Sequence, residues 1–482
     1  MVKAKDFRKV GRRIKVPFLL PMDKEIGFLL CEEVLRVVPG KRVALKGKWK
    51  DRKVFVKLFY KKFAVRRHVK CELSGYKAIC KVGLPTPKLL HVCQKSVGGL
   101  GIIVFEYLTD AEALVDIIHD PLRGTDAIDL TYECVSIIAR LHENGILHLD
   151  PHLGNFLLRG DRVIITDYSS IALGSISSTT AFKNLGYYLA QLPWEDEDNI
   201  KKLISYYLKE RGISITGLEK DYILKFTKRY QDRILTRYKK KLFRESSHIG
   251  CNKTFWEVAY YNRDFFHEED HVSKLIKDTL NHKERVIIKN GRTSTVFIVQ
   301  LSGQRLVVKR YNIKNRWHGL RKAFMRSRAH KSWENSHLLR KLGIPTPIPV
   351  AMIEDRIGMF RRTSYFIYKY VDGIEAHTFF KKNKYDDCKG IAQDLVELLG
   401  RLYRNRILHG DTKASNFIIT DHGIYVVDLD TMKVRTNRVI FHFKKRKEIS
   451  RFFKNWKTDD SLHQLIKKLA TENLLHESKK EE

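Results

Sequence analysis

The sequence predicts an α+β protein made of two similar domains, each with an antiparallel, strand-rich first lobe and a mainly helical second lobe. Three observations predict this class. The chain has 482 residues, about three times the length of an average domain. Its motifs recur at an offset of about 261 residues. In each copy, β-branched and aromatic runs come before the helical segments. The expected domains are residues 1–240 and 241–482.

The repeat is visible in three pairs of motifs. ILHLDPHLGNFLL at 146–158 matches ILHGDTKASNFII at 407–419, and GLPTP at Gly83 matches GIPTP at Gly343. The strand-like VIITDYS and YVVDLDT place Asp167 and Asp428 in the same register. Agreement to within one residue favours a duplicated domain over coincidence. The boundary is expected in the basic helical stretch at 234–246.

The first copy begins with three runs that read as antiparallel strands, LRVVPG, RVALKGKW and KVFVKLFY. A helix containing Glu72 follows, and GLPTP forms a rigid extended connection because proline fixes the backbone. GIIVFEYL is typical of a buried strand. Apolar residues at helical spacing predict a helix in YECVSIIARLHENG that ends at Gly145. The H-x-D loop and the strand VIIT complete the copy.

The second copy repeats this order of elements. VIIKNGRTSTVFIV and RLVVK are the expected first strands, and a helix containing Glu334 comes before GIPTP. YFIYKYV, a helix that ends in LLGRLYRNR, the loop HGDTKASN and the strand YVVDLD follow. Each copy has about 240 residues, which is enough for an independent core.

Each loop has an Asp and, five positions later, an Asn, and a hydrophobic strand that ends in a second Asp follows. Phosphoryl transfer from ATP with Mg²⁺ requires this arrangement: the first Asp orients the attacking hydroxyl, while the Asn and the later Asp offer oxygen ligands to magnesium. A strand lysine, steadied by a helix glutamate, neutralises the phosphates. The expected sets are Lys57, Glu72, Asp150, Asn155 and Asp167, and Lys309, Glu334, Asp411, Asn416 and Asp428. Asp430 is a further candidate metal ligand. His148 and His409 are expected to hydrogen-bond the loop backbone.

On these motifs the chain resembles the protein-kinase-like superfamily and, within it, the lipopolysaccharide core kinases, which phosphorylate heptose or Kdo sugars. HGDTKASNF, SWENSHLLRKLGIPTP and NGRTSTVFIV carry the resemblance in the second copy, and VFVKLFY, GLPTP and LDPHLGNFLL carry it in the first. The resemblance implies two tandem kinase-like domains, ATP and Mg²⁺ as cofactors, and a core glycan or similar anionic glycolipid as acceptor. It also implies a cytoplasmic protein with peripheral association at the inner membrane.

The sequence departs from the protein-kinase pattern at several motifs. Neither copy has a G-x-G-x-x-G loop, so Gly40 and Gly291 are the candidates for covering the phosphates. The loops read HLD and HGD instead of HRD, and no A-P-E segment follows. A small-molecule or glycan acceptor is therefore favoured over a protein. Ser169 stands where the second copy has Asp430.

The charge is strongly positive: 91 basic and 55 acidic residues give +36. A field of this size favours a polyanionic partner, and because no nucleic-acid reader motif is found, no nucleic acid is expected. The aromatic and basic stretch at 439–458 fits either an anionic membrane surface or a packed helix with a basic face. No apolar run is long enough to span a membrane. Seven scattered cysteines suit a reducing compartment.

Two other functions remain open from the sequence. A protein kinase or another small-molecule phosphotransferase of the same fold would use the same catalytic set. A partly inactive assembly factor for the cell envelope is the alternative from another class, and Ser169 makes it conceivable for the first copy.

Overall fold

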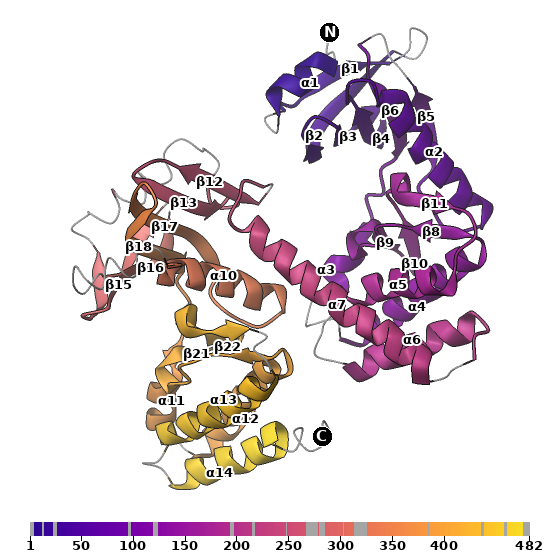
Figure 1. Cartoon of the computed structure of the whole chain (residues 1–482). Coiled ribbons are helices and arrows are strands. Elements are labelled where there is room, and N and C mark those ends of the chain that lie inside the picture. Colours follow the sequence, from indigo (N-terminus) through magenta and orange to yellow (C-terminus); the bar gives the residue numbers. More distant parts are fainter. Residues whose placement is uncertain are drawn as a thin grey trace. The chain divides into compact units, whose positions relative to one another are not determined.

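The structure is a computed structural model of the whole chain. It describes residues 4–11, 14–22, 27–94, 98–118, 124–192, 197–214, 217–246, 248–266, 278, 285–301, 303–312, 325–383, 385–434, 438–456 and 460–475. The chain divides into two compact units, Met1–Asp232 and Arg233–Glu482. The division falls inside helix α7 (Gly217–Lys241), eight residues before the expected position at 240. Figure 1 shows the elements of both units.

The first lobe of the first unit is a six-stranded antiparallel sheet in the order β1-β2-β3-β4-β6-β5. Its strands are β1 (Phe18–Pro21), β2 (Phe28–Val38), β3 (Arg42–Trp49), β4 (Arg52–Phe59), β5 (Leu89–Cys93) and β6 (Gly101–Glu106). β4 carries the expected lysine run and pairs with both β3 and β6. The strands predicted from LRVVPG, RVALKGKW and KVFVKLFY are confirmed as β2, β3 and β4.

Two helices cover this sheet on opposite faces. Alternation along β4 sends Val54, Val56 and Leu58 into a cluster with Phe7 of α1 (Ala4–Val10). Phe59 instead joins the cluster of α2 (Val65–Lys81), which contains Val69 and Ile79. Because both faces are covered, the sheet is rigid and fixes the position of Lys57 on β4.

The second lobe of the first unit is mainly helical. Its elements are β7 (Ala111–Ala113), α3 (Leu114–Ile118), α4 (Gly124–Glu143), β8 (Ile146–His148), η2 (Leu153–Asn155), β9 (Phe156–Arg159), β10 (Arg162–Ile165), η3 (Tyr168–Ser170), β11 (Ile171–Leu173), α5 (Ser178–Leu189), α6 (Glu197–Glu210) and the start of α7. The predicted helical stripe of Val135, Ile138 and Leu141 is buried in α4. Gly145 follows this helix with a positive φ of 67°, a conformation that glycine adopts without strain.

The second unit has a seven-stranded sheet in the order β12-β13-β17-β18-β16-β15-β14. These strands are β12 (Ile249–Lys253), β13 (Glu257–Asn262), β14 (Val286–Asn290), β15 (Ser294–Leu301), β16 (Gln304–Tyr311), β17 (Pro349–Ile357) and β18 (Phe360–Lys369). Helix α10 (Arg328–Lys341) packs on one face through Trp333, which is fully buried beside Met352 and Phe366. The indole N–H of Trp333 donates to the Leu242 carbonyl over 3.2 Å.

The second lobe of this unit contains β19 (Ile374–Glu375), α11 (Ala376–Lys382), α12 (Tyr385–Arg404), β20 (Ile407–Leu408), η4 (Ala414–Asn416), β21 (Phe417–Thr420), β22 (Gly423–Val426), η5 (Leu429–Thr431), β23 (Lys433–Val434), α13 (Arg438–Phe453), η6 (Lys454–Trp456), α14 (Asp460–Ala470) and η7 (Thr471–Leu475). Its short strands pair as β19-β21-β22 and β20-β23. The first unit pairs its short strands in the same way, as β7-β9-β10 and β8-β11.

The predicted α+β class with antiparallel sheets is confirmed. Of the stretch 439–458, the part within α13 and η6 buries Phe441, Phe452 and Trp456, so these aromatics pack within the lobe. Residues 457 and 458 lie outside the described residues. Among the helices that the structure describes, none has both the length and the apolar character needed to cross a bilayer.

Candidate active site

The loop that carries Asp150 is held by its own backbone and by His148. Nδ1 of His148 accepts from the Asp150 N–H over 3.3 Å, and Nε2 faces the Thr166 carbonyl at 3.4 Å. The Asn155 amide donates to the Asp150 carbonyl over 2.9 Å, and the Thr166 N–H donates to the Asn155 carbonyl over 2.8 Å. This chain of bonds links Asp150 and Asn155 to the residue before Asp167. Burial lowers the pKa of His148, which keeps the imidazole neutral as these bonds require.

The second unit repeats this loop bond for bond. Nδ1 of His409 accepts from the Asp411 N–H over 3.3 Å, and Nε2 faces the Val427 carbonyl at 3.0 Å. The Asn416 amide donates to the Asp411 carbonyl over 2.8 Å. The expected scaffolding role of His148 and His409 is therefore present in both units.

The acid that follows β10 in the first unit and the acid that follows β22 in the second unit both have a left-handed backbone conformation. Asp167 has φ 61° and Asp428 has φ 60°. This region is costly for most residues, though Asp tolerates it better than most. This strained conformation occurs at the same position in both units. It turns the carboxylate of Asp167 toward Lys57 and that of Asp428 toward Lys309.

In the first unit, Lys57, Glu72 and Asp167 form a buried cluster. The Lys57 ammonium lies 2.5 Å from Glu72 Oε1 and 3.4 Å from Asp167 Oδ1. Glu72 is fully buried on α2, and its Oε1 also accepts from the Tyr168 N–H over 3.2 Å. The structure thus brings together the three residues that the sequence predicted here.

Arg42 is a member of this cluster that the sequence analysis missed. Its guanidinium reaches both oxygens of Asp167, at 3.2 and 3.3 Å, and donates to Ser169. Burial alone would raise the pKa of Asp167, but the charges of Lys57 and Arg42 hold it well below its usual range. A single basic residue at the start of a strand cannot be recognised as a site residue from one sequence. Arg42 lies near Lys57 because β3 pairs with β4, with Ala44 opposite Lys57.

In the second unit, the expected pairing of Lys309 with Glu334 was wrong. The Lys309 ammonium bonds Asp428 and lies 4.0 Å from Asp430, while Glu334 pairs with Lys239 at 2.8 Å and Arg326 at 3.3 Å. The reason is helix register. Glu72 stands eleven residues before Gly83, and the residue eleven before Gly343 is Ser332. Ser332 hydrogen-bonds the Tyr311 hydroxyl at 2.8 Å, so Glu334 faces a different side of α10.

The structure gives Asp430 a different partner from the expected metal ion. Its Oδ2 accepts from the Arg328 guanidinium over 2.6 Å, and its side chain is almost fully buried. Asp428 keeps the position equivalent to Asp167. Burial opposes ionisation of Asp428, but Lys309 lowers its pKa overall. Arg42 contacts the Asp167 carboxylate in a similar way, so this ion pair does not distinguish the two acids, and metal binding by Asp430 stays a prediction.

The two candidate glycines lie in hairpin turns. Gly40 has φ 70° in the turn between β2 and β3, where a left-handed conformation favours glycine. Gly291 donates its N–H to the Ser294 carbonyl over 3.0 Å in the turn between β14 and β15. Neither residue lines the cavities described below, so their part in covering phosphates remains a prediction.

A cavity of about 380 Å³ lies between the lobes of the first unit. Lys57, Asn155 and Asp167 line it together with Arg42, and apolar walls come from Ala44 and Leu157. Mg²⁺ prefers carboxylate and amide oxygens and completes its shell with water and phosphate. Asn155 and Asp167 offer this donor set beside a lysine, so the residues present fit a magnesium-bound nucleotide. In the second unit, Asn416 and Asp428 provide the same donor types.

Two further residues lie against the predicted catalytic acids. The Tyr187 hydroxyl donates to Asp150 Oδ1 over 3.1 Å, and the Lys413 ammonium is 3.3 Å from Asp411 Oδ2. Lys413 is largely exposed, so it can turn from Asp411 toward a negatively charged reactant. The spacing D-x-K in HGDTK was a usable signal for Lys413; Tyr187 lies too far along the chain to be predicted.

Helix α13 and the following turn η6 hold the loop of the second unit that carries Asp411. Glu448 accepts from the Gly410 N–H over 2.6 Å, Arg451 donates to the Gly410 carbonyl over 2.8 Å, and Asn455 donates to the Thr412 carbonyl over 2.8 Å. Burial raises the pKa of Glu448 to about 7. This pKa makes the loop anchor sensitive to pH in the neutral range.

Residues 278–468 match the model of the lipopolysaccharide kinase (Kdo/WaaP) family. This part of the chain is similar to that family. The matched residues include Lys309, Asp411, Asn416 and Asp428, and they confirm the resemblance that the motifs predicted for the second copy. Kinases are phosphotransferases, so the match supports this class of activity. A search of curated proteins gives no match to the chain.

Proposed function

We propose that this protein is an ATP-dependent sugar kinase that phosphorylates a heptose or Kdo residue of the lipopolysaccharide core. In this proposal both units are kinase-like domains that arose by duplication. The observation that carries it is the repeated wiring of the catalytic loop: His148, Asp150 and Asn155 are bonded as His409, Asp411 and Asn416 are. The family of residues 278–468 supports the choice of acceptor.

The roles of the residues follow from their positions. Asp150 and Asp411 would accept the proton of the attacking hydroxyl. Lys57 and Lys309 would neutralise the phosphates, with Lys57 held in place by Glu72. Asn155 with Asp167, and Asn416 with Asp428, would hold magnesium. When bound, ATP with Mg²⁺ supplies the phosphoryl group and neutralises its charge.

The strong positive charge supports an anionic glycolipid as the partner. An acceptor that already carries phosphate or carboxylate would be drawn to a protein of charge +36. We propose that the protein acts at the cytoplasmic face of the inner membrane, where the lipid part of such an acceptor is anchored.

The test is transfer of labelled phosphate from ATP to core oligosaccharide isolated from a strain that lacks this protein. The proposal expects label in the oligosaccharide and a gain of phosphate by mass spectrometry. Label found in protein with none in the glycan would overturn the acceptor and favour a protein kinase of the same fold.

A second candidate function rests on the differences around the two lysines. In the second unit Ser332 takes the position of Glu72, and Lys309 pairs directly with Asp428. This difference favours a function in which one unit is catalytic and the other unit is regulatory. Separate substitutions of Asp150 and Asp411 distinguish one active unit from two.

A further inference from the structure

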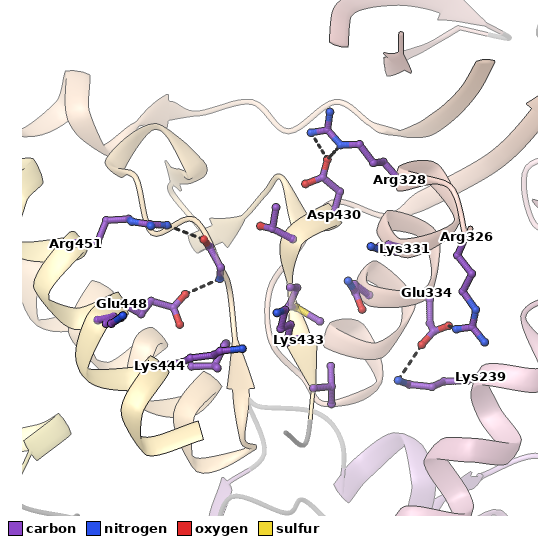
Figure 2. A pocket seen from close by; sticks show the side chains of 17 residues that line it. Lys239, Arg326, Arg328, Lys331, Glu334, Asp430, Lys433, Lys444, Glu448 and Arg451 are labelled. Carbon is purple, nitrogen blue, oxygen red and sulfur yellow. Dashed lines mark hydrogen bonds and ion pairs between the residues drawn. The ribbon is translucent and has the colours of Figure 1, made fainter. Parts of the chain in front are cut away.

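A second cavity, of about 800 Å³, lies in the second unit. Residues of α10 and α13, together with Thr431 to Val434 and Gly410, contribute to its lining. Figure 2 shows Lys331 on α10 and Lys444 on α13 on opposite sides, with Lys433 between them. The cationic side chains of this lining are Lys239, Arg326, Arg328, Lys331, Lys433, Lys444, Lys447 and Arg451.

The lining contains three acids, and each already has a partner. Glu334 pairs with Lys239 and Arg326, and Asp430 pairs with Arg328. Glu448 accepts from the Gly410 N–H. Eight cations against three acids leave this cavity with a formal charge of +5, and the acids neutralise none of the lysines on α13.

Four lysines of the lining form no ion pair with the acids that line it. Within the parts of the chain that the structure describes, no ion pair forms at Lys331, Lys433, Lys444 or Lys447. A hydrogen bond with the Lys433 side chain, and then the charge of Lys433, lower the pKa of Lys444, so the two side chains lie close together. Two ammonium groups this close repel each other, and an anion placed between them would remove the repulsion.

We propose that this cavity, which we call the α10–α13 pocket, binds a small ligand with two or more phosphate groups. Its volume is that of a small-molecule site. Its unpaired cations come from three separate elements, α10, β23 and α13, so one phosphate group would not reach them all. Phosphate oxygens accept several charge-assisted hydrogen bonds each, which suits this density of lysines.

The pocket is distinct from the proposed nucleotide site. Lys309 and Asp428 line another, smaller cavity with Tyr368 and Thr346, and they do not line the α10–α13 pocket. The proposal therefore does not depend on kinase activity. The phosphate groups have two conceivable sources: the acceptor itself, or a separate phosphorylated ligand.

The direct test measures binding of glucose 1,6-bisphosphate to the full chain by isothermal titration calorimetry, with a non-hydrolysable ATP analogue and Mg²⁺ present throughout. The triple variant K433Q/K444Q/K447Q should bind the probe at least about tenfold more weakly than the wild type, because three charge-assisted contacts are lost. The control K381Q/K382Q/K468Q removes the same charge at exposed positions outside the pocket and should bind within about twofold of the wild type.

If both triple variants bound the probe equally weakly, binding would depend on net charge alone. This result would overturn the proposal that the α10–α13 pocket is the binding site. So would failure of the wild type to bind the probe. Thermal unfolding of each variant checks that the fold is retained.

The same variants identify the source in the labelled-phosphate assay. If the acceptor supplies the phosphates, K433Q/K444Q/K447Q raises the KM for the acceptor and leaves the KM for ATP unchanged. If a separate ligand supplies them, the KM for the acceptor stays the same while added bisphosphate changes kcat in the wild type only. Absence of transfer by the wild type would count against the proposed function and leave the binding result intact.

Discussion

The ion pair of Lys57 and Glu72 is buried: Lys57 is 7% exposed and Glu72 is 0% exposed. Removing one charge from such a pair leaves the other without compensation in a low-dielectric environment, which costs about 3–5 kcal/mol in typical proteins. Glu334 is different, because its partners Lys239 and Arg326 are 30% and 66% exposed, whereas the Lys57 side chain is 8% exposed. Lys309 pairs with Asp428 instead. Substitution of Glu72 is therefore expected to have a large effect, and substitution of Glu334 a small one.

We expect E72Q to weaken nucleotide binding by the first unit about tenfold or more and to lower its unfolding temperature, because Lys57 loses its buried counter-charge. E334Q, the matched control in the second unit, should leave nucleotide binding by that unit unchanged, because Lys309 pairs with Asp428 and not with Glu334. Titration with a fluorescent ATP analogue and thermal unfolding measure the two effects. Equal losses in the two variants would contradict the account of α10's register.

Glu448 gives the second unit a pH-dependent stability. Its pKa is about 7 in the fold and near 4.5 when unfolded, so the folded state favours the protonated form. This contribution to stability is complete below pH 4.5 and is lost as the pH rises through 7. The wild type should therefore lose stability between pH 5 and pH 8 relative to E448Q, which keeps an oxygen to accept from Gly410. Parallel melting-temperature curves for the two proteins would refute this.

Residues that follow a spacing rule could be predicted, and residues that depend on packing could not. The positions of Asp150, Asn155 and Asp167 follow from one motif and the next strand, and the register from GLPTP would have corrected Glu334 to Ser332. Arg42 reaches Asp167 across 125 residues of sequence. Only the pairing of β3 with β4 and the packing of the two lobes bring these residues together.

At the level of elements, α2 lies so close to η3 that a side chain has no room at one position. A Cβ on Gly75 would lie 2.1 Å from the Tyr168 carbonyl oxygen, which is backbone and cannot rotate away. The same contact holds Glu72 against the Tyr168 N–H. In the second unit, Asn335 stands at the equivalent position and bonds the Leu429 carbonyl over 2.7 Å.

G75A should destabilise the first unit by about 1–3 kcal/mol, because the added methyl must push α2 away from η3. G390A is the control: Gly390 lies inside α12 with no atom within 4 Å of its Cβ position, and the change should stabilise the helix by about 0.5–1 kcal/mol. Denaturant unfolding measures both. A G75A protein as stable as the wild type would mean that α2 packs less closely than described.

The type of an element was predictable wherever its apolar residues kept a regular spacing, alternating in β4 and following the helical repeat in α4. The role of α13 was not predictable. Its sequence fits a membrane-surface helix as well as a packed one, and its contacts with Gly410 and Thr412 join residues 36–41 positions apart. Phe441 and Phe452 pack inside the lobe, whereas Val439, Ile440 and Phe443 are exposed, so contact of this helix with a membrane surface stays a prediction.

At the scale of the whole molecule, two compact units share one pattern of short strands and one wiring of the catalytic loop. They differ in how the strand lysine is held and in the basic pocket described for the second unit. A charge of +36 attracts anionic partners to the whole chain, but the unpaired lysines of the α10–α13 pocket give that attraction a local site.

The most direct test of the account compares labelled-phosphate transfer from ATP by the wild type, D150A, D411A and the double variant D150A/D411A. Removal of the proposed proton-accepting group should lower the rate by about 10²–10⁴-fold in any unit that performs the reaction. The double variant should therefore be inactive. Each single variant should lose only the activity that its substituted unit contributes. Wild-type transfer by a folded double variant would contradict the claim that these two loops carry the chemistry.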